Sequence, residues 1–221
     1  MPSVGSEPMK QVSSIGTTQR FIDTGKHLHA FAGEVLVRCI QCENAGAVVA
    51  EWGSHGWNAL FQCKSCALEL KSGDWVGPVK LEGRQPCGYC GYKWLDPSVE
   101  LSRPPASPPT SLQQECPECG HKTPVTVSVA MTQPSDHCID PHFGLPLRLT
   151  QETRFGTVWA YNQKHVEELL GYVSAKLRVR QSPGNSAMFS RLPRWMKVAE
   201  HRDEVTKALS RLSAEVSGFR A

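Results

Sequence analysis

Eight of the nine cysteines in this sequence form four Cys-x-x-Cys pairs, and cysteine thiolates are strong ligands for metal ions. Each pair places two sulfurs on one tight turn, and two such turns complete a tetrahedral shell of four thiolates. The sequence therefore predicts two metal sites, which we expect to hold two Zn²⁺ ions. The predicted ligands are Cys39, Cys42, Cys63, Cys66, Cys87, Cys90, Cys116 and Cys119.

The spacing alone does not determine which pairs share a metal. Twenty residues separate Cys42 from Cys63, and twenty also separate Cys66 from Cys87, so the two middle pairs or an interleaved arrangement would fit as well. We expect sequential pairing, because two apolar stretches at 47–52 and 57–62 flank Gly53-Ser54-His55-Gly56 and predict a β-hairpin. We call each Cys-x-x-Cys turn a knuckle. A knuckle, a hairpin and a second knuckle together are the layout of a zinc ribbon.

We predict that both metal sites have a structural and not a catalytic role. A closed shell of four thiolates leaves no coordination position at which zinc could activate water. The sequence contains no phosphate-binding glycine loop, His-Glu-x-x-His helix or nucleophile elbow. The ninth cysteine, Cys138, follows Asp136 and His137, and side chains adjacent in sequence seldom have the geometry of a nucleophile and its base. We therefore expect a protein that is not an enzyme and has no small-molecule substrate.

The distribution of charge directs attention to the C-terminal part of the chain. Eight thiolates and two Zn²⁺ ions would lower the formal charge of +3 to −1. Residues 141–221 nevertheless contain 13 Lys and Arg against 7 Asp and Glu. No apolar run reaches membrane-spanning length and the first residues contain no apolar leader, so we expect a cytoplasmic protein without membrane contact. A reducing cytosol also favours metal thiolates over disulfides.

We predict an α+β fold in which two small zinc-ribbon units precede a β-hairpin and C-terminal helices. Strands are expected at 34–38 and 125–130, and a hairpin at 145–150 and 157–161. Asn162 is a candidate helix N-cap, followed at helical spacing by Val166, Leu169, Leu170, Val173 and Leu177, with Lys176, Arg178 and Arg180 at the end of this helix. A last helix carries Val205, Leu209, Leu212 and Val216 on one face.

The expected domain organisation has four parts. Residues 1–30 are rich in Ser, Gly, Thr and Gln and are interpreted as a disordered tail. Residues 31–80 form the first zinc ribbon and residues 81–135 the second. The second contains the proline-rich segment 102–110, which is incompatible with a helix or a central strand. Residues 136–221 contain the β-hairpin and a basic helical segment, which Ser182-Pro183-Gly184-Asn185 interrupts.

The basic stretch from Lys176 to Arg202 is the candidate nucleic-acid contact, because guanidinium groups next to aromatic rings suit phosphate contact and base stacking. In the alternative interpretation, Phe189 and Trp195 pack in the core and the charges coat the surface; a third possibility is an acidic protein partner. The residues proposed for nucleic acid are Arg178, Arg180, Arg191, Arg194, Trp195 and Lys197.

Two resemblances rest on these residues. Residues 87–97 (CGYCGYKWLDP) and 116–120 (CPECG) resemble the metal knuckles of rubredoxins, which hold one iron and transfer electrons. Segments 140–147 (DPHFGLPL), 158–162 (VWAYN), 192–197 (LPRWMK) and 202–205 (RDEV) resemble a bacterial family of zinc-ribbon-containing proteins, known mainly as uncharacterised. Its members often have cysteines in the turn before the segment at 158–162. Arg154-Phe155-Gly156 contains none, so the resemblance implies no third metal site here.

Together these features predict a bacterial metal-binding module that contacts nucleic acid or serves as an adaptor. A protein-interaction scaffold without nucleic acid is one alternative. A rubredoxin-like electron carrier, with iron at the second site, is the other.

Overall fold

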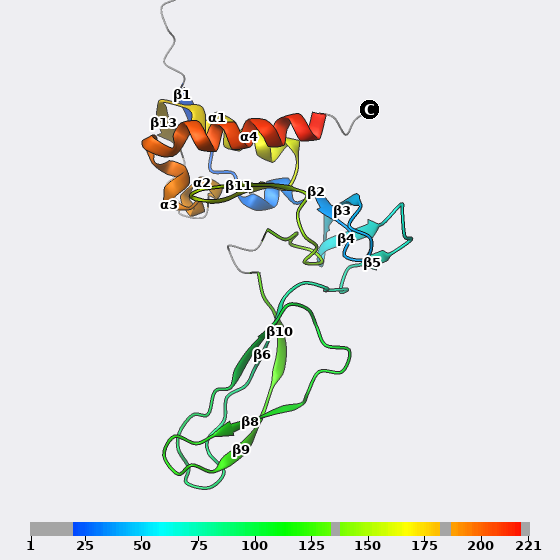
Figure 1. The fold of residues 1–221 in the computed structure, drawn as a ribbon, viewed down its shortest axis with the longest axis vertical. Helices are drawn as coiled ribbons and strands as arrows, with labels where there is room; N and C mark the ends of the chain where they lie inside the picture. The colour runs from blue at the N-terminus through cyan, green and yellow to red at the C-terminus, as the bar shows by residue number, and fades with distance from the viewer. Residues whose placement is uncertain (1–19, 134–137, 182–186, 218–221) are drawn as a thin grey trace, which may run out of the picture.

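A computed structural model of the chain describes residues 20–133, 138–181 and 187–217. It has the expected α+β character, with small antiparallel sheets that carry the cysteine knuckles, then a hairpin and C-terminal helices (Figure 1). Our expectations for residues 1–19, for Asp136 and His137, and for the break at 182–185 lie outside the described residues. Figure 1 shows an upper body, to which both ends of the described chain belong, and an arm that extends below it.

The first ribbon is a four-stranded antiparallel sheet in the order β2-β3-β4-β5. The expected hairpin is present, with Trp52 paired with Trp57 and Gly53 with Gly56. Inward-facing Val48, Ala50, Ala59 and Phe61 are buried, as alternation along two strands predicts. The strands are β2 (Glu34–Arg38), β3 (Ala45–Gly53), β4 (Gly56–Gln62) and β5 (Glu69–Lys71).

The arm consists of residues 79–131 and contains two small sheets. One has the order β10-β6-β7, and the other pairs β8 with β9. The expected strand at 125–130 is divided in two, because the chain changes partner at Val127, whose N–H donates to the carbonyl of Thr110. The strands are β6 (Val79–Glu82), β7 (Ser98–Leu101), β8 (Ser111–Glu115), β9 (Lys122–Thr126) and β10 (Ser128–Met131). As predicted, the proline-rich segment 102–110 forms no helix or strand.

The C-terminal part returns to the body. A hairpin of β11 (Leu149–Thr153) and β12 (Gly156–Ala160) precedes helix α1 (Gln163–Ser174). Asn162 caps α1 as predicted: its side chain accepts the N–H of His165 and donates to the carbonyls of Phe31 and Glu34. This cap fastens the helix to the first ribbon. The remaining helices are α2 (Met188–Arg191), α3 (Arg194–Lys197), the 3₁₀ turn η2 (Ala199–His201) and α4 (Arg202–Ser217).

Two expectations for the ends of these elements were wrong. Residues 20–30, which we expected within a disordered tail, contain strand β1 (Arg20–Asp23) and the 3₁₀ turn η1 (Leu28–Phe31). Helix α1 stops at Ser174, and Leu177–Arg180 forms strand β13, which pairs in parallel with β1. Leu177 is therefore half-exposed on a strand instead of belonging to the helical stripe.

A single cluster of buried apolar side chains joins the first ribbon to the C-terminal hairpin and helices. It runs from Phe31 to Leu70 and from Phe143 to Val216. On α4, the predicted stripe of Val205, Leu209, Leu212 and Val216 is buried in this cluster. Within the described residues, no helix is both long enough and apolar enough to cross a lipid bilayer.

Candidate metal centres

The structure brings the eight predicted ligands together as two groups of four. In each group the sulfur atoms all lie within 4.8 Å of one another. The first and second pairs share one group, and the third and fourth share the other, so the sequential pairing is confirmed. The two groups are Cys39, Cys42, Cys63 and Cys66, and Cys87, Cys90, Cys116 and Cys119.

All four knuckles have the same backbone geometry. In each, the N–H of the residue after the second cysteine donates to the carbonyl of the first cysteine, at 2.9–3.1 Å. The N–H of the first cysteine also donates to the carbonyl of the residue five positions later, at 2.8–2.9 Å, where the chain turns back. The first set of donors is Glu43, Ala67, Gly91 and Gly120, and the second is Cys39, Cys63, Cys87 and Cys116.

The residue after the second cysteine adopts a positive φ in every knuckle, but its type differs between the two sites. Gly91 and Gly120 of the second site each have a φ of 73°, which costs glycine little. Glu43 and Ala67 of the first site have φ values of 60° and 59°, in the left-handed region that L-residues rarely occupy. The first site therefore holds two strained residues that the second site lacks.

The first site is part of the main core. Cys39 and Cys63 are 1% and 5% exposed and belong to the large cluster, while Cys42 and Cys66 pack against it. The sulfur of Cys39 lies 3.5 Å from that of Cys66, and the same distance separates Cys42 from Cys63. Strands β2 and β4 end directly before the two knuckles, so the sheet that builds the core also sets the distance between them.

Backbone N–H groups favour the thiolate form of one cysteine in each site. The N–H groups of Ser65 and Cys66 lower the pKa of Cys63 to about 6. In the second site, the N–H groups of Cys90 and Tyr89 lower the pKa of Cys87 to about 6, and the hydroxyl of Thr123 contributes as well. Metals bind the thiolate, so these donors favour metal binding at Cys63 and Cys87. Burial and neighbouring cysteines, in contrast, raise the pKa of Cys66, Cys90 and Cys119.

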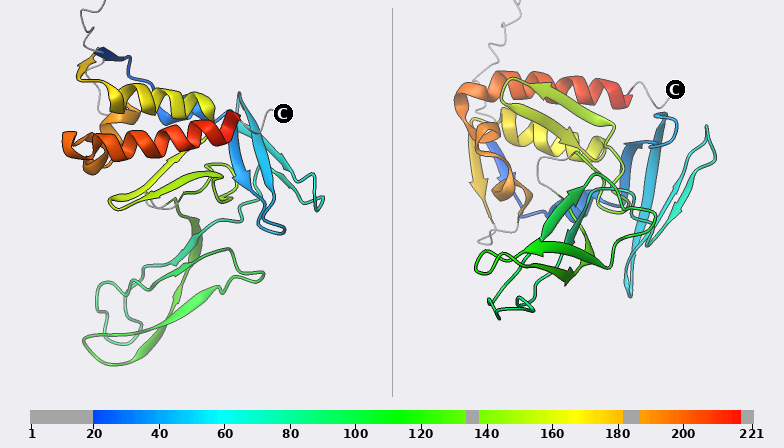
Figure 2. Two further views of the ribbon diagram at one scale, coloured as in Figure 1. Left: turned by 45° about the horizontal axis from the view of Figure 1, so that its top comes forward. Right: turned by 60° about the horizontal axis from the view of Figure 1, so that its bottom comes forward.

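The second site lies near the far end of the arm and has little apolar cover. The two sheets of the arm lead to it, well away from the helices (Figure 2). Its sulfurs are 3.7 Å apart for Cys90 and Cys116 and 3.8 Å apart for Cys87 and Cys119. Cys90 is exposed, whereas no ligand of the first site is.

Both groups suit a tetrahedral metal. Four thiolates are the donor set of structural zinc and also of iron in rubredoxin-type sites. A metal ion bound to all four sulfurs would cross-link two knuckles and leave no position open for a substrate. The arrangement can therefore hold a fold together, and it offers no machinery for activating water.

Two cations of the basic stretch are used in contacts within the protein. The guanidinium of Arg178 donates to the carbonyls of Tyr172, Val173 and Lys197 and so covers the C-terminus of α1. The ammonium of Lys197 donates to the carbonyl of Ser190. Both cations thus bind the protein's own backbone, which was not apparent from sequence spacing.

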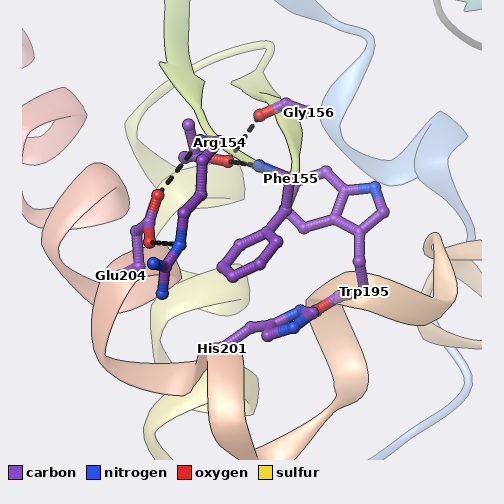
Figure 3. Close-up of polar contacts among 7 residues, drawn as sticks. Arg154, Phe155, Gly156, Trp195, His201 and Glu204 are labelled. Atoms are coloured by element: carbon purple, nitrogen blue, oxygen red, sulfur yellow. Dashed lines mark hydrogen bonds and ion pairs between the residues drawn. The ribbon is translucent and has the colours of Figure 1, made fainter.

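The aromatic residues of this stretch also pack inward. Phe189 is 2% exposed and stacks on Tyr172, with the ring centroids 4.2 Å apart. Trp195 packs against the main core, and its ring lies against Gly156 in the turn between β11 and β12 (Figure 3). Phe189 therefore lies in the core, as the alternative interpretation expects, and Trp195 is partly buried against it. Arg191 and Arg194 are exposed, and a guanidinium N–H of Arg180 donates to the hydroxyl of Ser190.

Cys138 belongs to neither group of ligands. It is partly buried against the main core, and its carbonyl accepts the N–H of Leu147. The sequence had also not drawn attention to the aromatic residues around the second site. Tyr89 lies between two ligands in the sequence, and Trp94 follows them closely; both side chains are exposed. The sequence signal for this exposure is an aromatic residue inside a knuckle.

Comparison with protein families, with curated proteins and with solved structures found no match for this chain. The similarity to zinc ribbons therefore rests on the two four-cysteine groups and the knuckle geometry.

Proposed function

We propose that this protein is a non-enzymatic, metal-stabilised adaptor that binds a protein partner through the far end of its arm. The observation that supports this most is the group of exposed aromatic side chains around the second site. Tyr89, Trp94 and Tyr92 are 66%, 41% and 39% exposed. Tyrosine, tryptophan and arginine are the residues that most often dominate the energy of protein interfaces.

The contacts of these side chains hold them ready for binding. The guanidinium of Arg84 lies 4.4 Å from the ring centroid of Trp94, and the ring of Tyr89 stacks on His121 at 4.2 Å. Rings that are already held in place lose less conformational entropy on binding. We name Arg84, Tyr89, Tyr92, Trp94 and His121 the arm tip.

The charge of the arm favours a protein over a nucleic acid. Residues 79–131 contain five Lys and Arg and five Asp and Glu, so the arm has no excess of cations. Four thiolates around one divalent metal would add two negative charges. Nucleic acid binding depends on neutralising phosphates with cations, which this arm cannot provide in excess.

The double variant Tyr89→Ala/Trp94→Ala tests this proposal. Affinity capture from native cells should recover a protein with the unchanged chain and lose it with the variant, while the metal content stays the same. Trp52→Ala is the matched control, because Trp52 is a tryptophan 67% exposed on the first ribbon. Equal capture by all three proteins, or capture that nuclease treatment abolishes, would contradict the proposal.

A second candidate is nucleic acid contact by two exposed cations, Arg191 at the end of α2 and Arg194 at the start of α3. Log affinity falls with log salt, and each lost phosphate contact makes this negative slope shallower by about 0.9. Arg191→Ala/Arg194→Ala should then reduce the slope for retention on DNA or RNA by about 2. Arg38→Ala/Lys64→Ala, which removes two exposed cations from the first ribbon, should change it less. Equal slopes for both variants would exclude this surface.

For the metal, we propose zinc at both sites. The support is chemical: a closed set of four thiolates is the usual donor set of structural Zn²⁺. Elemental analysis of protein purified without added zinc should give two zinc ions per chain and a colourless solution. A red protein that bleaches on reduction would instead support the rubredoxin-like electron carrier.

A further inference from the structure

The two metal sites differ in how much of the protein supports them. The first site shares the main core with the hairpin and the helices. The second has a separate core whose buried members are Cys87, Leu95, Cys116 and Val125. Two of these four residues are the metal ligands themselves. Without its metal, this cluster keeps only Leu95 and Val125 as buried apolar anchors.

Such a small cluster cannot hold the arm by apolar burial alone. Outside this cluster the arm also buries Val79 and Leu81, both on β6. The backbone entropy lost on folding grows with every residue ordered, so these few apolar side chains cannot offset it over residues 79–131. Structural zinc supplies folding free energy directly in small units of this kind. The second four-cysteine group is therefore placed to stabilise the arm when it holds a metal.

The junction with the body limits how far unfolding would spread. The N–H of Thr132 donates to the carbonyl of Pro78, so both ends of the arm leave the body at one place. On the body side, the N–H groups of Val76 and Gly77 donate to the carbonyl of Phe143, which is completely buried. A Cβ on Gly77 would lie 2.7 Å from the Cα of Gly144, so these two backbones are packed in direct contact. None of these hydrogen bonds involves a residue of the arm.

We propose that the second site is an exchangeable metal site whose occupancy switches the arm between a folded and an unfolded state, while the body and the first site stay folded. Exposed Cys90 gives chelators and competing thiols access to the metal, whereas the first site presents no exposed ligand. With the metal bound, the knuckles hold the arm tip together; without it, Tyr89 and Trp94 lose their positions. The control of partner binding rests on the proposed function, but the local unfolding does not.

Titration of the zinc-loaded protein with EDTA, under a phosphine reductant that keeps the thiols reduced, tests the switch. The first zinc equivalent should leave about tenfold faster than the second, or faster still, because local opening costs less free energy than global unfolding. Hydrogen exchange should show that amides within 79–131 lose protection with this first equivalent, while amides of β2–β4, α1 and α4 keep theirs. Added Zn²⁺ should restore the protection.

Intrinsic fluorescence gives an independent readout, because Trp94 is the only tryptophan among residues 79–131. Loss of the first zinc should change the tryptophan emission of the protein without substitutions, and Trp94→Phe should abolish that change. Simultaneous loss of both metals, or an arm that stays protected after one metal has left, would overturn the proposal.

Two matched ligand variants separate the sites. Cys90→Ser should bind one zinc, leave the arm unprotected and unfold the body at nearly the unchanged temperature. Cys42→Ser removes a ligand from the site within the main core and should lower the unfolding temperature of the body. If both variants destabilise the body equally, the switch is refuted. If exchange shows the switch but no partner depends on the arm tip, only the proposed function fails.

Discussion

Glu43 and Ala67 show that a metal knuckle can be built without the glycine that the second site uses. A non-glycine residue in the left-handed region costs about 1–2 kcal/mol. The first site tolerates this cost because two of its cysteines, Cys39 and Cys63, are buried in the main core and the other two pack against it. At the scale of single residues, the two sites therefore differ in how much backbone strain the surrounding packing offsets.

Glu43→Gly and Ala67→Gly should each stabilise the zinc-loaded body by about 0.5–1 kcal/mol, because glycine relieves the backbone strain but loses more entropy on folding. Gly91→Ala should weaken the second site by about 1–2 kcal/mol through backbone strain alone, because a Cβ there meets no atom within 4 Å. Urea unfolding checks the first pair, and competition with a zinc indicator checks the third. Destabilisation by Glu43→Gly would show that Glu43 contributes a contact that outweighs its strain.

His165 is a buried residue with a predictable response to pH. Its ring is 2% exposed, stacks on Phe31 and accepts the N–H of Tyr161 at Nδ1. Burial lowers the pKa of His165 to about 3. The unfolded chain binds this proton near pH 6.5, so the contribution of His165 to stability falls as the pH drops from 6.5 towards 3. The slope is about 1.4 kcal/mol per pH unit.

Nitrogen NMR of the imidazole should show His165 neutral at pH 5 in the folded protein. The same ring should titrate near pH 6.5 in urea-denatured protein, which is the matched reference. A folded-state midpoint above pH 6 would mean that the ring is hydrated or has an acidic partner.

At the scale of elements, side-chain packing holds the β11–β12 turn against the helices more than its ion pair does. Arg154 forms an ion pair with Glu204, with 2.8 Å between Nε and Oε2, but its side chain is 72% exposed. Phe155 stacks on His201 with ring centroids 3.5 Å apart, and Gly156 has a φ of 138° against the ring of Trp195 (Figure 3). A Cβ on Gly156 would lie 3.0 Å from that ring.

Gly156→Ala should therefore destabilise the body by roughly 2–4 kcal/mol through strain and crowding. Glu204→Gln should cost less than about 1 kcal/mol, because an exposed ion pair contributes little. Thermal unfolding of the two variants compares them directly. A larger effect from Glu204→Gln would mean that charge positions the turn.

Elements with a strong local pattern were predictable from the sequence. The β3–β4 hairpin, the Asn162 cap and the apolar stripe of α4 follow from alternation, capping and helical spacing. Strand β13 was not predictable, because its partner β1 lies far away in the sequence and no local signal links them. The eight ligands were predictable from the Cys-x-x-Cys spacing, and their division into two sets from the hairpin expected between the first two pairs. The separate core of the second site was not, because it depends on which elements pack together.

At the scale of the whole molecule, the arm is an insertion between two neighbouring points of the body. Replacing residues 79–131 by two glycines should give a body that binds one zinc and unfolds within a few degrees of the complete protein, since the Pro78 carbonyl and the Thr132 N–H are hydrogen-bonded. Metal analysis and calorimetry check this. A shortened chain that aggregates or binds no zinc would show that the arm stabilises the body.

Parallel pairing of β1 with β13 has a consequence for synthesis on the ribosome. Arg20–Asp23 leaves the exit tunnel early, but its partner Leu177–Arg180 is translated only near the end of the chain. Until then Phe21 lacks its neighbours Tyr172 and Phe189, and Ile22 lacks Val179. Until β13 is made, the nascent chain therefore carries Phe21 and Ile22 without their native partners, and transiently exposed apolar side chains favour aggregation. Among the residues that the structure describes, the strand made earliest thus acquires its partner late.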